Sequence, residues 1–164
     1  MIELIDPIIS SNKVDISTGL NVHYLEASKN NNNQPIALLL HGFPELSFSW
    51  RKIIPILAYE GFRVIAPDMR GYGLTSGGTK KYDTNISEYR LLNLTTDILS
   101  LISALKINKV DLLVGHDAGS SVAGTSALIR PDIFKSVVMM SAPFTGAPNI
   151  DSNLSYQDPI HKDL

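Results

Sequence analysis

The segment best suited to chemistry is the pentapeptide GHDAG, which joins an apolar run to a helical pattern and has Asp117 at its centre. A sharp turn between a strand and a helix pushes its central side chain out over the edge of the sheet, in a backbone conformation that most residues avoid. Gly115 and Gly119 let the strand and the helix approach closely. The free N–H groups at the start of the helix favour an anion at the same place. The segment therefore predicts an ionised carboxylate that acts as a nucleophile.

A carboxylate at such a turn suits displacement at a saturated carbon. The ordinary pKa of aspartate is about 3.9, so Asp117 is ionised at neutral pH and needs no base for the attack. Attack on an ester would give an anhydride, whereas attack on an epoxide or on a carbon–halogen bond gives an alkyl ester. Water must then hydrolyse that ester with the help of a base, usually histidine, and of donors that stabilise the oxyanion.

Donors for the oxyanion are expected in the segment HGFPE, which follows an earlier apolar run. Its turn can present the backbone N–H of Phe43 beside that of Ala118, and two such donors form the usual oxyanion hole. His41, Gly42 and Pro44 are expected to support this turn. For His41 an orienting role is favoured over a proton shuttle.

We expect structural rather than catalytic roles for the other polar and aromatic candidates. Adjacent side chains on a tight turn point apart, so His116 is expected to be packed or bonded to backbone rather than to act as the base. His23 is expected at the surface of a hairpin. Asp68 and Arg70 are expected to hold their own loop through an ion pair or backbone bonds. Trp50 falls on the apolar stripe of a helix and is expected in the core.

The elements that must position these residues alternate along the chain. A hairpin is expected over residues 13–28, buried strands over 36–41, 62–68, 109–116 and 135–143, and helices over 47–59, 91–105 and 118–128. Pro55 is expected to delay or kink the first helix, and Asn85 with Glu88 can cap the second. This alternation predicts a mostly parallel sheet with helices on both faces, whose functional loops follow the carboxyl ends of the strands.

The composition of the chain argues against several classes of partner and site. The chain has 164 residues, a formal net charge of −2 and no cysteine. The absence of a basic excess argues against nucleic acid and membrane partners, and the absence of cysteine excludes disulfides and cysteine-based metal sites. We expect neither a metal nor a cofactor. The first residues do not read as a secretory signal and no apolar run is long enough for a membrane helix, so a cytoplasmic protein is expected.

Three motifs, HGFPE, PDMRGYGLTS and GHDAGS, occur in this order. Together they resemble the α/β-hydrolase superfamily and, within it, the epoxide hydrolases, over about residues 14–147. The resemblance implies that Asp117 is the nucleophile and that the HGFP residues help to form the oxyanion hole. It also implies a mainly structural loop made of Asp68, Arg70, Gly71, Gly73 and Ser76.

One departure from the family refines the expected reaction. Many relatives carry tryptophan directly after the nucleophile, where haloalkane dehalogenases use it to bind the leaving halide, and fluoroacetate-cleaving relatives tend to carry arginine. This chain has Ala118. Epoxide opening to a diol is therefore favoured over dehalogenation, and an esterase is disfavoured by the aspartate itself. The alternative from another class is a non-catalytic remnant or an interaction module.

The resemblance also implies missing parts. We interpret residues 1–147 as the N-terminal part of the core and residues 148–164 as an irregular tail at the start of a missing cap. The acid and the histidine of the family follow the nucleophile on later strands, and Asp158, His161 and Asp163 are not expected to replace them. The chain is therefore expected to be incomplete and inactive alone. The strand over residues 136–142 is expected to form an uncovered edge that associates with other chains.

Overall fold

A computed structural model of the protein describes residues 5–29, 34–78 and 86–142. The predictions for Asn85, for the tail over 148–164 and for its polar residues lie outside this part of the chain. Within it, six strands form one sheet: β1 (Ser10–Asp15), β2 (Asn21–Ala27), β3 (Ile36–Leu40), β4 (Arg63–Pro67), β5 (Leu112–His116) and β6 (Val137–Met140).

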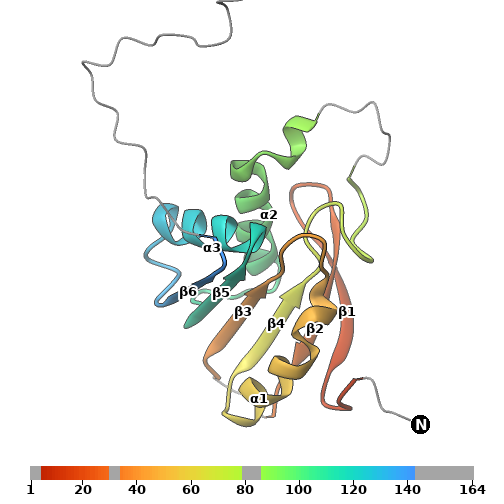
Figure 1. Ribbon diagram of the computed structural model, residues 1–164, viewed down its shortest axis with the longest axis vertical. Coiled ribbons are helices and arrows are strands. Elements are labelled where there is room, and N and C mark those ends of the chain that lie inside the picture. The colour runs from red at the N-terminus through yellow and green to blue at the C-terminus, as the bar shows by residue number, and fades with distance from the viewer. Residues whose placement is uncertain (1–4, 30–33, 79–85, 143–164) are drawn as a thin grey trace, which may run out of the picture.

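The sheet is mostly parallel, as predicted. Its strand order is β1-β2-β4-β3-β5-β6 (Figure 1). The hairpin β1–β2 is antiparallel and joins β4 in antiparallel orientation, whereas β4, β3, β5 and β6 run parallel to one another. The carboxyl ends of β3 and β5 therefore lie next to each other, and the loops that follow them carry Phe43 and Asp117.

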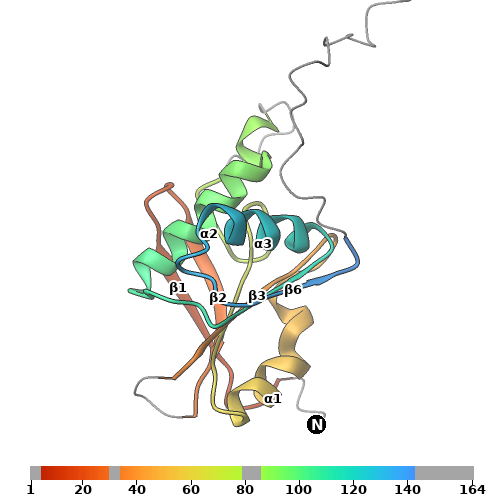
Figure 2. The ribbon, with the colours of Figure 1, turned by 90° about the vertical axis from the view of Figure 1, so that its left-hand side faces the viewer.

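Helices cover both faces of the sheet (Figure 2). The 3₁₀-helix η1 (Ser47–Lys52) and α1 (Ile53–Tyr59) pack on one face, and α2 (Leu91–Ala104) and α3 (Ala118–Ile129) pack on the other. Strand β3 serves both layers, because Leu38 and Leu40 pack with the α2–α3 side and Ala37 and Leu39 with the α1 side. This alternation explains why β3 reads as a continuous apolar run.

The helix predicted over 47–59 begins late, because its first six residues form η1. Pro55 lies in the first turn of α1, where a missing N–H is tolerated. Trp50 is buried against Ile54 and Ala58, which confirms its place in the core.

The predicted cap of α2 by Asn85 and Glu88 includes Asn85, which lies outside the described residues. A short 3₁₀-helix, η2 (Ile86–Tyr89), precedes α2, and Arg90 occupies the N-cap position without a side-chain capping bond. Glu88 forms an ion pair with Arg70 at 3.2 Å. The carboxylate that the local sequence pattern places at the helix terminus therefore also takes part in a long-range contact.

Strand β6 lies at the edge of the sheet formed by the described residues. It pairs with β5 alone there, and the side chains of Val138 and Met140 are exposed. This agrees with the edge predicted over 136–142. Association through this edge stays a prediction.

Candidate active site

Asp117 occupies a strained turn between β5 and α3. Its backbone has φ 51° and ψ −120°, a region that residues other than glycine rarely adopt. Helix α3 begins at the next residue, so the first N–H groups of the helix lie beside the Asp117 side chain. The carboxylate is half-buried, which leaves it accessible to a small molecule.

The carboxylate is held by backbone donors from two segments. The N–H of Phe43 donates to Oδ1 of Asp117 at 2.9 Å. Hydrogen bonds from the N–H groups of Phe43 and Ala118 hold the pKa of Asp117 below its ordinary value of 3.8. The two donors expected for an oxyanion hole therefore converge on one carboxylate, which they keep ionised.

Close packing around the turn leaves no room for side chains at three positions. A Cβ atom at Gly42 would lie 2.5 Å from Cβ of Asp117 and 2.9 Å from its Oδ1. A Cβ atom at Gly115 would lie 2.3 Å from the carbonyl oxygen of Gly119, and one at Gly119 would lie 2.4 Å from the carbonyl oxygen of Leu40. Close contacts with backbone atoms at Gly115 and Gly119, and with the Asp117 side chain at Gly42, therefore require glycine at these positions.

The loop after β3 forms a tight turn over the carboxylate. The N–H of Glu45 donates to the carbonyl oxygen of Gly42 at 3.2 Å, and the peptide bond between Phe43 and Pro44 is cis. The side chain of Phe43 is 68% exposed. Its aromatic ring is therefore free to contact an apolar ligand next to Asp117.

His41 anchors the start of this turn. The residue is fully buried, and burial lowers the pKa of its imidazole. Nδ1 lies 2.9 Å from the carbonyl oxygen of Gly42, and Nε2 lies 3.0 Å from the N–H of Met69. These partners assign a neutral ring that donates through Nδ1 and accepts through Nε2. With both nitrogens engaged, His41 is placed to orient the loop, and it has no free position for moving a proton.

His116 differs from its expected surroundings. It was expected to be packed or bonded to backbone, but its Nδ1 lies 3.1 Å from Oε2 of Glu45. The expectation failed because it considered only the turn itself, whereas the partner carboxylate comes from the loop after β3. The pair connects the loop that carries Phe43 to the turn that carries Asp117.

His23 is buried, so the prediction of a surface position is wrong. Strand β2 pairs with β1 and β4 along its two edges, and the loop after β4 packs over the ring of His23. The ring bridges two elements, with Nε2 2.8 Å from Oγ of Ser11 and Nδ1 2.7 Å from Oδ2 of Asp68. Asp68 also accepts the N–H groups of Ser47 and Leu74, each at 2.9 Å. Although burial opposes its ionisation, these hydrogen bonds lower the pKa of Asp68.

Arg70 fixes the same loop through a different carboxylate. Its Nε and Nη2 donate to the two oxygens of Asp97 on α2, at 2.7 and 2.8 Å. Thr18, in the turn of the hairpin, donates to Asp97 at 2.6 Å. Asp68 and Arg70 thus hold their loop as expected, but each does so through partners of its own.

Strand β6 supports the Asp117 turn from the other side. The N–H of Asp117 donates to the carbonyl oxygen of Met140 at 2.9 Å. The hydroxyl of Ser120 lies 2.7 Å from the carbonyl oxygen of Gly115 and accepts the N–H of Met140 at 2.9 Å. Sequence reasoning did not single out Ser120, although it lies within the GHDAGS motif and is fully buried.

Substituting alanine for Ser120 is expected to lower the free energy of unfolding by about 1–3 kcal/mol, because it leaves the N–H of Met140 without its acceptor. Urea unfolding measures the loss. Ser126→Ala is the matched control, since Ser126 is equally buried on the same helix but only donates to the Val122 carbonyl within that helix. Equal losses in both variants would show that Ser120 has no particular role at the turn.

Within residues 5–29, 34–78 and 86–142, no three side chains of His, Cys, Asp or Glu gather so as to hold a metal ion. No helix there is long and apolar enough to cross a bilayer.

Comparison with known proteins agrees with the motifs and with the sheet order. Residues 35–161 match the family model described as the alpha/beta hydrolase fold. The chain belongs to the α/β-hydrolase family. This confirms the family predicted from the motifs HGFPE, PDMRGYGLTS and GHDAGS.

Among its relatives in the α/β-hydrolase family are several epoxide hydrolases. An epoxide hydrolase of Caballeronia sordidicola is 43% identical over 79% of this chain and 37% of its own length. One from Neurospora crassa is 36% identical over 97% of this chain and 47% of its own length. The solved structure of epoxide hydrolase I from potato (Solanum tuberosum) has a TM-score of 0.75 and 36% identity, covering 87% of this chain and 43% of that one. The chain therefore spans less than half the length of each of these relatives.

Proposed function

We propose that this α/β-hydrolase opens epoxides through an ester on Asp117. The observation that carries the proposal is an ionised carboxylate, held on a strained turn by the N–H groups of Phe43 and Ala118. The relatives named as epoxide hydrolases support the same substrate class.

In the first step, a carboxylate oxygen of Asp117 bonds to a ring carbon of the epoxide. The bond between that carbon and the ring oxygen breaks, its electron pair goes to the oxygen, and the oxygen takes a proton from water. The product is a hydroxyalkyl ester of Asp117. In the second step, water adds to the ester carbonyl, and the N–H groups of Phe43 and Ala118 stabilise the oxyanion. The oxyanion collapses to the diol and the free carboxylate, and the proton that the added water loses neutralises the hydroxide left by the first step.

Two other reactions of the same fold are less well supported. A haloalkane dehalogenase needs a donor for the departing halide, and the methyl side chain of Ala118 offers none. An esterase would form an anhydride at Asp117, which gives the enzyme no advantage over direct hydrolysis. Opening of a strained ring needs only the nucleophile and a proton from water in its first step.

We propose further that the isolated chain performs the second step slowly, as the sequence led us to expect. Of the described histidines, His23 and His41 use both ring nitrogens in other contacts. His116 uses Nδ1 for Glu45. No described histidine is held in hydrogen bond to Asp117, so an ester formed there is expected to persist. From the sequence alone, we also propose that the protein is located in the cytoplasm.

The test is single labelling by styrene oxide. Incubation of the full chain is expected to add one hydroxyalkyl group, which intact-mass spectrometry detects and peptide mapping assigns to Asp117. Asp117→Asn is expected to abolish the adduct, whereas the matched variant Asp132→Asn keeps it, because Asp132 is exposed and away from the turn. No adduct, or an equal adduct on Asp117→Asn, would contradict the proposal and favour a non-catalytic remnant or interaction module.

The pH dependence of labelling checks the state of the nucleophile. The folded pKa of Asp117 is below its ordinary value, so the carboxylate stays ionised until the pH falls through that lowered pKa. The labelling rate is therefore expected to be flat between about pH 5 and pH 7. If the ester turns over instead of persisting, His116→Asn shows whether His116 supplies the base.

A further inference from the structure

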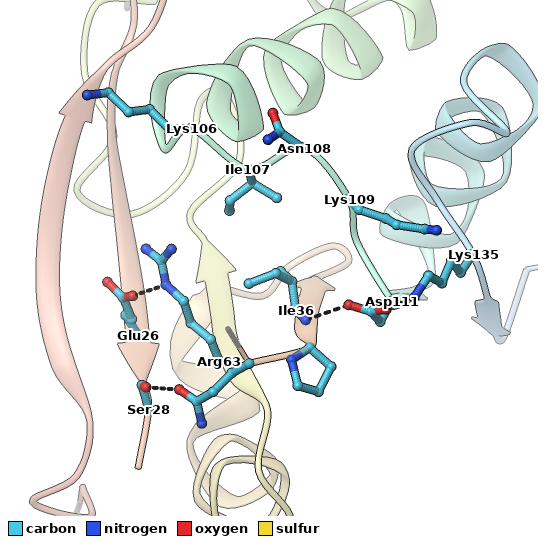
Figure 3. Close-up of a pocket in the computed structure, with 12 residues that line it drawn as sticks. Glu26, Ser28, Ile36, Arg63, Lys106, Ile107, Asn108, Lys109, Asp111 and Lys135 are labelled. Carbon is cyan, nitrogen blue, oxygen red and sulfur yellow. Dashed lines mark hydrogen bonds and ion pairs between the residues drawn. The ribbon is translucent and has the colours of Figure 1, made fainter. Parts of the chain in front are cut away.

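A cavity lies at the opposite end of the parallel strands from Asp117. It has a volume of about 710 Å³ and opens where β3 and β5 begin, while Asp117 follows the end of β5 (Figure 3). The N–H of Ile36 donates to Oδ2 of Asp111 at 3.0 Å, which ties the first residue of β3 to the residue before β5. The cavity is therefore built on the rigid starts of two central strands.

The charges around this cavity are unbalanced. Four cations line it, against two carboxylates: Arg63, Lys106, Lys109 and Lys135 against Glu26 and Asp111. Both carboxylates are already neutralised. Glu26 pairs with Nε of Arg63 at 2.5 Å, and Asp111 pairs with Lys135. The lining thus keeps a net charge of +2 in a chain whose formal net charge is −2.

Three of the cations have donors left for a ligand. Arg63 uses only Nε for Glu26, and in Figure 3 its two terminal nitrogens lie on the side of the cavity bordered by Ile107. Lys106 and Lys109 flank Ile107 on an exposed loop and form no ion pair within the described part of the chain. Lys106 has φ 56°, so the chain turns sharply there and leaves Ile107 buried between the two lysines.

The uncharged wall of the cavity combines apolar residues with the polar residues Ser28, Gln34 and Asn108. The apolar residues are Pro35, Ile36 and Ile107, and the volume falls in the range of small-molecule sites. Two uncompensated positive charges match the charge of a phosphate monoester, which is about −2 at neutral pH. We propose that this cavity binds a small organic phosphate, with the phosphate group on Arg63, the apolar part against Ile36 and Ile107, and the charges of Lys106 and Lys109 attracting the anion from opposite sides of the cavity.

Phenyl phosphate is the probe for this proposal. Titrated into the ¹⁵N-labelled full chain, it is expected to cause saturable shifts at the amides of Ile36, Arg63 and residues 106–109. The amides of Phe43 and Ala118, at the other end of the parallel strands, are expected to stay unchanged. Phenol, which lacks the phosphate, is expected to produce no saturable shifts.

The double variant Lys106→Gln, Lys109→Gln is expected to weaken binding about fivefold, since exposed charges each contribute little and are screened by salt. Lys13→Gln with Lys52→Gln is the matched control, because both lysines are exposed and lie outside the cavity. Equal affinity in the two double variants, shifts centred on Asp117, or no saturable binding would overturn the proposal. None of these outcomes depends on the reaction at Asp117, so the two proposals fail separately.

Discussion

Substituting alanine for Asp97 is expected to lower the free energy of unfolding by about 3–5 kcal/mol, because it leaves a buried guanidinium without its main partner. The side chains of Arg70 and Asp97 are only 9% and 7% exposed, and they share two hydrogen bonds. Thr18 loses its acceptor in the same variant. The pair joins the hairpin, the loop after β4 and α2, so its loss is expected to loosen all three.

A pair with the same geometry at the surface provides the control. Arg130 and Asp132 also share two hydrogen bonds, at 2.8 and 2.7 Å, but their side chains are 45% and 63% exposed. Asp132→Ala is therefore expected to change stability by less than about 1 kcal/mol. The double variant Asp97→Leu, Arg70→Met is expected to recover much of the loss, because it removes the unpaired charge together with its partner. Urea unfolding measures the free energy of unfolding of all variants. If Asp97→Ala loses no more than Asp132→Ala, the buried pair does not stabilise the fold as proposed.

Gly42→Ala is expected to slow the labelling of Asp117 by styrene oxide about 100-fold, because small displacements of reacting groups reduce rates steeply. The added methyl would lie 2.5 Å from Cβ of Asp117 and 2.9 Å from the carbonyl oxygen of His116. These contacts push the loop away from the carboxylate and move the N–H of Phe43 off Oδ1. Loss of that donor misplaces the nucleophile and also removes one of the two N–H groups that stabilise the oxyanion.

The control for Gly42 is Gly78→Ala. A Cβ atom at Gly78 would meet its nearest neighbours at 3.7 and 3.8 Å, which is ordinary contact. Circular dichroism on both variants separates a displaced loop from an unfolded chain. Labelling of folded Gly42→Ala at the parent rate would mean that the position of Phe43 does not limit the attack.

The parts of the fold that were predicted correctly depend on local patterns. The strands, the hairpin and α3 follow from apolar runs and turn residues, and their boundaries agree to within a few residues. The ion pair between Glu88 and Arg70 was not predicted, because the two residues are 18 positions apart in sequence. His23 was misplaced for the same reason, since its partner Asp68 is 45 residues distant.

In the candidate site, too, the residues within local motifs were predicted and the contacts between distant elements were not. Asp117, its glycines and the donor of Phe43 stand in short motifs, so their types and order could be read from the chain. Glu45 opposite His116, and Ser120 against Met140, depend on how β3, β5 and β6 lie side by side. No spacing within one segment encodes such contacts.

Because β6 supports the Asp117 turn, the turn cannot be complete until β6 has been synthesised. Besides Phe43 and Ala118, whose N–H groups hold the carboxylate, Ser120 and Met140 support the turn, and Met140 is the end of β6. N-terminal segments leave the ribosome first and can fold as units. A nascent chain therefore completes the backbone support of its reactive turn only once Met140 has emerged.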